Sequence, residues 1–155
     1  ASERNRLAQS PVTLRLAMDG RLGSLPQGDW ADTLPHRLLG LQFPEHPIQP
    51  GDRWPDPALA RPFSNFLPAE TVREVGATVQ FVGLFQGEAL LAQLRNKGQI
   101  TAETALAPLT LALDGESWWE PETGLLRERW VRGELRQGED AVSGRLEIHL
   151  ELSDP

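Results

Sequence analysis

The sequence predicts a mainly β protein, an antiparallel meander that forms a curved sheet or a partly open barrel, with one helix as an open alternative. Segments in which apolar and polar residues alternate, as in strands with one buried face, recur in the C-terminal half of the chain. Short turn sequences separate them, such as Gln137-Gly138-Glu139-Asp140. A length of 155 residues, 39% of them hydrophobic, suits a single domain with a real core.

The N-terminal part of the chain begins with a polar segment, residues 1–10, that we expect to be frayed. In residues 12–18, apolar side chains then alternate with polar or small ones up to Asp19-Gly20, which predicts a strand running into a turn. Residues 38–41 form a second short apolar run.

Residues 26–68 contain nine of the 13 prolines. Because proline breaks helices and cannot donate to a sheet ladder, we expect a long ordered loop that covers the surface. Aromatic side chains within it should anchor it to the core, namely Trp30, Phe43, Trp54, Phe63 and Phe66. In the phrase Gly51-Asp52-Arg53-Trp54 we expect a turn held by the aspartate side chain, with the tryptophan as an anchor.

The sheet core is predicted over residues 71–155. Ala77 to Phe85 is expected to be a strand that carries Val79, Phe81 and Phe85 on one face. Glu88 to Lys97 is ambiguous: its residues are strong helix formers and Gly98 would end a helix, so local propensity favours a helix over a strand.

The last third of the chain predicts three strands joined by short turns. Leu109, Leu111 and Leu113 alternate with small or polar residues and run into Asp114-Gly115. Residues 120–124 form a hairpin loop with glycine at its last position, and a strand follows over residues 125–136. The final strand should face the core through Val142, Leu146, Ile148, Leu150 and Leu152. The chain is thus expected to be one domain, which leaves open that its sheet forms part of a larger one.

Composition excludes several classes of function. The formal net charge is −7, and Lys97 is the one lysine among 15 basic residues, so no concentrated positive surface is expected for nucleic acid or an anionic membrane. The absence of cysteine excludes disulfides, cysteine nucleophiles and zinc–thiolate sites. No segment is apolar over the length of a membrane-spanning helix. The chain begins at Ala1, as signal peptidase products do, although a truncated sequence would begin in the same way.

Two phrases in the chain are distinctive. The first runs from Phe43-Pro44 through Gly51-Asp52 to Trp54, and the second runs from Trp119 to Leu126 and contains the hairpin residues Thr123-Gly124-Leu125. Together they resemble an uncharacterised family of bacterial secreted proteins and lipoproteins. In that family a phrase of the first kind precedes a β-meander that contains the second. The aspartate that the family places before the hairpin is absent, and Glu120 lies nearby instead. The resemblance implies an exported, β-rich envelope protein and a strand over Glu88 to Arg95. It implies no activity.

Histidines and carboxylates are the candidate sites of chemistry. His36, His46 and the neighbouring Glu45 could converge on copper or zinc, but no His-x-His or His-x3-His spacing supports this and no cofactor is expected. Carboxylates gather around the hairpin, at Asp114, Glu116, Glu120 and Glu122. Such residues can serve glycoside hydrolysis or bind calcium, but a solvated acidic loop explains them better. Nucleophile-elbow and phosphate-loop motifs are missing.

The tryptophans are the strongest candidates for ligand binding. Trp118 and Trp119 are adjacent, so on a strand they point to opposite faces, and Trp130 could lie across the hairpin from one of them. Packing of the core explains these residues without any ligand. Tryptophan is also favoured in binding hot spots and apolar pockets, so the candidate ligand-binding residues are Trp118, Trp119, Trp130, Phe81 and Phe85.

Three hypotheses of function follow. The first is a non-catalytic module of the cell envelope, outside the cytoplasm, that binds other envelope proteins or contributes to a surface assembly. The second is a carrier of a lipid or another apolar molecule, in a cavity lined by Trp118 or Trp119 together with Phe81, Phe85 and Leu91. The third is a copper-dependent redox enzyme such as a superoxide dismutase, which requires His36, His46 and a carboxylate to converge.

Overall fold

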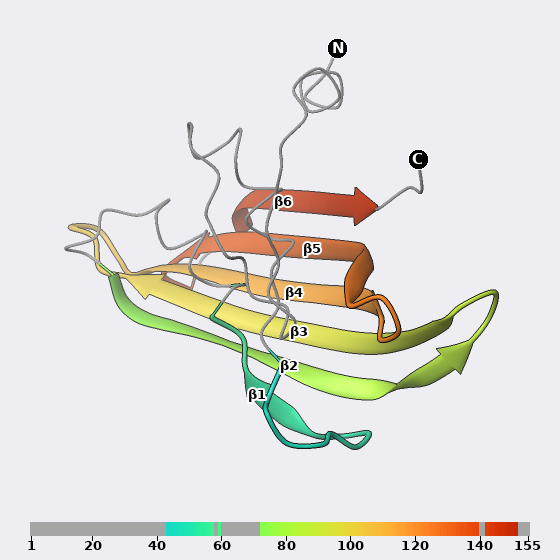
Figure 1. Cartoon of the computed structure of the whole chain (residues 1–155). Helices are drawn as coiled ribbons and strands as arrows, with labels where there is room; N and C mark the ends of the chain where they lie inside the picture. Colours follow the sequence, from blue (N-terminus) through green and yellow to red (C-terminus); the bar gives the residue numbers. More distant parts are fainter. Residues whose placement is uncertain (1–42, 58, 60–71, 140–141, 152–155) are drawn as a thin grey trace, which may run out of the picture.

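The computed structural model describes residues 43–57, 59, 72–139 and 142–151. They form one six-stranded antiparallel sheet whose strands lie in chain order (Figure 1). The strands are β1 (Arg53–Pro55), β2 (Val72–Gln86), β3 (Leu90–Ala102), β4 (Leu109–Glu120), β5 (Leu125–Gln137) and β6 (Val142–Glu151). The predicted meander is therefore confirmed in its curved-sheet form, and the described strands do not close into a barrel.

Tight connections produce this topology. In the β4–β5 hairpin the Gly124 N–H donates to the Glu120 carbonyl at 2.9 Å, and Gly124 has a φ of 70°. In the β5–β6 turn Gly138 has a φ of 63°, and its N–H donates to the Pro108 carbonyl at 2.8 Å. Glycine adopts these left-handed conformations without steric cost, so both turns lie where the sequence predicts them. Within the described part of the chain, no helix has the length and apolar character needed to cross a membrane.

The local preference for a helix over Glu88 to Lys97 is wrong. This segment belongs largely to β3, which pairs with β2 on one side and β4 on the other. Ala92, Leu94 and Asn96 are buried while Arg95 and Lys97 are exposed, a strict period of two. Pairing on both sides supplies more free energy than helix propensity, which differs by only tenths of a kcal/mol between such residues. Gly98 lies within the strand and allows close approach to Ala77, whose Cβ is 3.2 Å from the place of a Gly98 Cβ.

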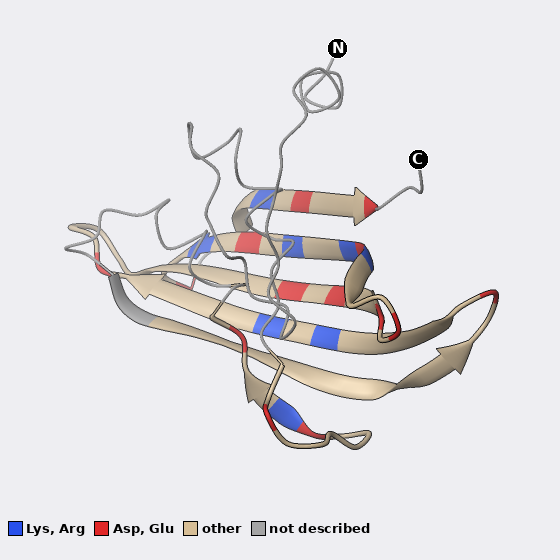
Figure 2. Ribbon diagram, viewed as in Figure 1, with Lys and Arg blue, Asp and Glu red and all other residues tan. Residues whose placement is uncertain are grey.

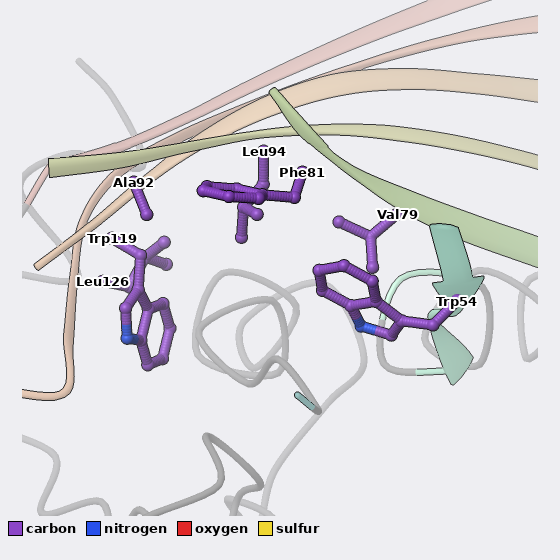
Figure 3. Packing of buried hydrophobic residues seen from close by; sticks show 7 residues of the cluster. All are labelled: Trp54, Val79, Phe81, Ala92, Leu94, Trp119 and Leu126. Carbon is purple, nitrogen blue, oxygen red and sulfur yellow. The ribbon is translucent and has the colours of Figure 1, made fainter. Parts of the chain in front are cut away.

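One face of the sheet, here called the inner face, carries the core. One cluster of buried side chains surrounds Trp54, Phe81 and Trp119 (Figure 3). A second cluster contains Leu59, Ile100, Leu111, Leu113 and Val131. Residues of the proline-rich stretch cover this face: Phe43 contacts both Trp54 and Trp119, and Leu59 is fully buried. Phe43 and Trp54 thus act as the anchors that the sequence predicts.

A turn before β1 brings Trp54 onto the sheet. The Asp52 N–H donates to the Gln49 carbonyl at 3.0 Å, and Asp52 Oδ2 accepts from the Gln49 N–H at 2.8 Å. Pro50 and Gly51, the latter with a φ of 97°, occupy the two central positions, as in a type II turn. Backbone bonds from Gly51 and Asp52 to Phe81 attach this turn to β2. The predicted turn, locked by an aspartate side chain, is confirmed.

The strand prediction for residues 12–18, the apolar run 38–41, the metal candidate His36 and the anchors Trp30, Phe63 and Phe66 lie outside the described residues, as does Leu152. The remaining predicted inner positions of β6 are half-buried, and they alternate with exposed polar ones as expected. β4 continues through Asp114-Gly115 without a turn. A Gly115 Cβ would lie 2.8 Å from the Trp130 carbonyl oxygen, so this glycine serves close pairing with β5.

Candidate functional site

A β-bulge in β2 turns Phe85 away from the core. The register shifts between Phe81 and Gly83, so residues beyond Val82 change faces. Val79 and Phe81 are buried on the inner face, whereas Phe85 lies on the opposite, outer face with 47% of its surface exposed. The prediction that all three share one face is therefore wrong for Phe85, because the extra residue of a bulge reverses the alternation.

On the outer face Phe85 meets Trp118. Their rings pack edge to face, with centroids 5.5 Å apart. Leu91, the register partner of Phe85, is half-buried and extends this apolar surface. We call Phe85, Leu91 and Trp118 the aromatic patch. It lies at the end of the sheet where β2 turns into β3.

Trp118 and Trp119 point to opposite faces, as expected for neighbours on a strand. Trp119 is buried on the inner face, where its ring lies 5.2 Å from that of Phe43. Trp130 does not pair with either residue: its register partners are Glu116 on β4 and His149 on β6. Its ring instead lies 4.8 Å from the guanidinium carbon of Arg132, a cation–π distance. The expected aromatic pair across the β4–β5 hairpin is therefore replaced by the Phe85–Trp118 pair across β2, β3 and β4.

Beyond the aromatic patch, the outer face carries charges of alternating sign from strand to strand (Figure 2). One row of register neighbours runs through Lys97, Asp114, Arg132 and Glu147. Arg95 similarly faces Glu116, and Glu134 faces Arg145. Opposite charges at directly facing positions stabilise a sheet and keep this face hydrated. The acidic residues Asp114 and Glu116 are therefore each matched by cations of the sheet.

A buried polar cluster crosses the inner face between the two apolar clusters. Asn96 Nδ2 donates to Asp56 Oδ2 at 2.6 Å, and Ser117 Oγ donates to Asn96 Oδ1 at 3.1 Å. Arg129 Nε donates to Ser117 Oγ at 2.8 Å. We call Asp56, Asn96, Ser117 and Arg129 the polar cluster; each has at most 1% of its surface exposed. It joins the residue after β1 to strands β3, β4 and β5.

The electrostatics of the polar cluster depend on Arg129 and Asp56. Burial lowers the pKa of the Arg129 guanidinium from its ordinary value, and the negative charge of Asp56 acts in the opposite direction and raises it. A lowered pKa means that the folded state disfavours the charged guanidinium relative to the unfolded chain. The carboxylate of Asp56 offsets part of this cost, so the two charges depend on one another.

The polar cluster lacks the arrangement of a serine nucleophile. The hydroxyl of Ser117 donates to an amide oxygen, which does not remove a proton as a histidine or carboxylate base would. Its oxygen also accepts from a cation, which stabilises it as an acceptor within the core. These contacts fasten the segment after β1 to the sheet.

The metal candidates Glu45 and His46 lie in the segment before β1 and are exposed. Across the described ranges, no three histidine or acidic side chains gather as metal ligands. The four carboxylates near the hairpin do not form one site: Glu120 pairs with Arg127, Glu122 is exposed in the turn, and Asp114 and Glu116 face cations. Glu120, which stands near the family's aspartate position, thus braces the hairpin through an ion pair.

The candidate ligand-binding residues are divided between the two faces. Phe81 and Trp119 belong to the packed inner core, while Phe85, Leu91 and Trp118 lie on the outer face. The sheet itself separates them, so they do not line one common cavity. The residues brought together instead are the aromatic patch on the outer face and the polar cluster on the inner one.

Sequence reasoning missed the polar cluster. A second bulge, where Arg127 stands opposite the step between Trp118 and Trp119, shifts the alternation of β5 and sends Arg129 inward. The sequence offers one signal for this placement: Arg129 stands two residues before Val131, and side chains two residues apart on a strand point to the same face.

Comparison with protein-family models, with curated proteins and with solved structures gave no significant match.

Proposed function

We propose that this chain is a non-catalytic module of the bacterial cell envelope, outside the cytoplasm, that binds a partner protein through the aromatic patch. The observation that carries this proposal is the bulge at Val82, which moves Phe85 out of the core and onto Trp118. Bulges of this kind re-aim side chains at functional positions. Core packing gives no reason to place a phenylalanine where 47% of its surface meets water.

The composition of the outer face suits protein binding. Aromatic residues and arginine are enriched where protein interfaces are tightest, and here Trp118, Phe85, Trp130 and Arg132 share one face. Charged rows border the aromatic patch on the side toward the middle of the sheet, like the polar rim beside the apolar centre of an interface. Among the described residues, Phe43, Trp54 and Leu59 pack against the inner face, and none of the segments outside the sheet packs in a core cluster on the outer face.

Two further observations support the other parts of the proposal. The hydrogen bonds of Ser117 give it a structural environment and no general base, which favours a module without catalysis. The two phrases that resemble secreted proteins and lipoproteins favour a place in the envelope. Both phrases have structural roles here, since one forms the turn before Trp54 and the other the β4–β5 hairpin.

Site-specific photo-crosslinking in the source bacterium tests this proposal. A photoreactive amino acid replaces Gln93, which is the register partner of both Gly83 and Trp118 and so borders the aromatic patch. The control position is Gln99, on the outer face of the same strand but next to Ala112 and far from the patch. We expect an adduct with one envelope protein from position 93, none from position 99, and loss of the adduct when Phe85→Ser is added.

Equal labelling from both positions, or an adduct that Phe85→Ser leaves unchanged, would contradict binding through the aromatic patch. Cell fractionation of the same strains tests the location, and recovery of the chain with cytoplasmic markers would contradict it. Native mass spectrometry of the purified protein distinguishes the carrier hypothesis, because a retained lipid-sized mass would replace partner binding with ligand transport.

A further inference from the structure

β6 is the last strand of the sheet, and within the described ranges it is bonded to a strand on one side only, β5 (Figure 1). It is ten residues long, contains no proline, and places no charged side chain on its inner face. The backbone N–H and C=O groups along the edge of a sheet can pair with another strand. Natural proteins therefore usually protect an edge of this length with a proline or an inward-pointing charge, among other features. β6 has neither a proline nor an inward-pointing charge, and its one β-bulge lies at its start, at Ser143, so that residues 144–151 form a regular edge.

We infer that β6 pairs with β6 of a second copy of this chain, antiparallel, so that two sheets join into one across a two-fold axis at Ile148. This concerns a different surface from the aromatic patch and does not depend on the proposed function. The argument for a second copy as the occupant is the charge pattern of the strand. Its outer positions are Ser143, Arg145, Glu147, His149 and Glu151.

The register about Ile148 places no two like charges opposite each other at the outer positions. Arg145 then faces Glu151 of the second copy, a pair of opposite charges, and Glu147 faces His149 of the second copy, a polar pair that can hydrogen-bond; each pair occurs twice by symmetry. Moving the axis to Glu147 would place that carboxylate against itself, and moving it to His149 would place Glu147 against Glu151. On the inner face the same register places Ile148 beside its own copy and Leu146 beside Leu150. All three side chains are only half-buried in the single chain.

One contact within the chain is improved by this pairing. Glu151 lies directly opposite Glu128 in the β5–β6 register. The Glu128 carboxylate contacts His149 Nε2 at 2.8 Å, whereas Glu151 faces no cation of β5. Facing carboxylates destabilise a sheet. Arg145 of the second copy would lie on the other side of Glu151 and supply the missing positive charge. The alternation of charge seen across β3 to β6 would thus continue into the second sheet.

Charge reversal at the facing pair tests the inference. Sedimentation velocity over a range of concentrations measures self-association of the full chain, of Arg145→Glu, of Glu151→Arg, and of an equimolar mixture of both variants. Each variant alone puts like charges against one another twice, so we expect its dissociation constant to rise about tenfold or more. In the mixture each interface pairs Glu with Arg at both positions, so a mixed dimer should form as readily as the unmodified one.

Matched controls are Glu122→Arg in the β4–β5 turn and Arg53→Glu on β1, which change the net charge equally on exposed residues away from β6. They should leave association unchanged, and thermal melts establish that all variants fold. A chain that stays monomeric at every concentration overturns the inference. A dimer insensitive to both reversals overturns it as well. A monomer whose β6 amides resist hydrogen exchange on both sides would assign the edge to another segment of the same chain.

Disulfide trapping tests the register independently of charge, because the chain has no native cysteine. Ile148→Cys lies on the axis and should give a covalent dimer under mild oxidation. Leu146→Cys and Leu150→Cys should each remain uncrosslinked alone and crosslink when mixed, since each faces the other. Crosslinking of Leu146→Cys by itself would show a different register and contradict the axis at Ile148.

Discussion

Arg129 and Ser117 are register partners on β5 and β4, and the Arg129 Nε donates to the Ser117 hydroxyl oxygen at 2.8 Å where both side chains are buried. From Ser117 the chain of hydrogen bonds passes through Asn96 to Asp56, in the segment that leads from β1. A polar path thus crosses three strands beneath the covering stretch.

Arg129→Met should destabilise the protein strongly. The substitution keeps much of the side-chain volume but leaves the Asp56 carboxylate buried without the charge of Arg129, for which a loss of about 3–5 kcal/mol in the free energy of unfolding is expected. Urea denaturation followed by tryptophan fluorescence measures this. Arg132→Met is the control: Arg132 is exposed and stacks on Trp130, so its loss should cost about 1 kcal/mol or less. Equal losses in the two variants would contradict the role assigned to the polar cluster.

Asn96→Asp should make stability depend on pH. The new carboxylate would lie beside Asp56 at the position where an amide now donates across 2.6 Å, so the pair would hold a proton more tightly in the folded than in the unfolded state. The folded state then binds more protons, and the free energy of unfolding falls as pH rises above about 4. Gln99→Glu, on the exposed outer face of the same strand, should show no such added slope. Denaturation midpoints between pH 4 and pH 8 separate the two.

The meander could be predicted from sequence because its signals are local. Gly124 and Gly138 mark the turns, and the period of two in β6 follows directly from the order of its residues. The turn at Gln49 to Asp52 was equally accessible, since proline, glycine and aspartate each have a defined position in it. These elements depend little on what lies elsewhere in the chain.

The site was less accessible because bulges change the parity of a strand. One extra residue at Val82 moved Phe85 to the outer face, and one at Arg127 moved Arg129 to the inner face. Neither bulge has a glycine or proline at its extra residue to reveal it. The helix expectation for β3 failed for a related reason: the two strands that pair with it are distant in sequence, and their contribution exceeds local propensity.

Gly115→Ala should destabilise the β4–β5 pairing. A Cβ at this position would lie 2.8 Å from the carbonyl oxygen of Trp130, which is backbone and cannot rotate away, so a loss of about 1–3 kcal/mol is expected. Gly144→Ala is the matched control on β6. There the nearest atom, the Leu135 Cβ, lies at an ordinary 3.6 Å, and replacing glycine within a strand should leave stability unchanged or raise it by about 0.5–1 kcal/mol. Thermal melts of both variants decide this, and two equal shifts would contradict the close approach.

Trp118→Ala and Trp119→Ala should differ widely although the residues are neighbours. Trp119 is buried among Phe43, Ala92 and Leu126, so its truncation leaves a cavity and should cost about 3–5 kcal/mol. Trp118 contributes mainly its edge-to-face contact with Phe85, for which about 0.5–1.5 kcal/mol is expected. Urea denaturation followed by far-ultraviolet circular dichroism compares the two without relying on tryptophan emission. A Trp118→Ala variant that unfolds as easily as Trp119→Ala would show that Trp118 is a core residue. That result would contradict the interpretation of the aromatic patch as a binding surface.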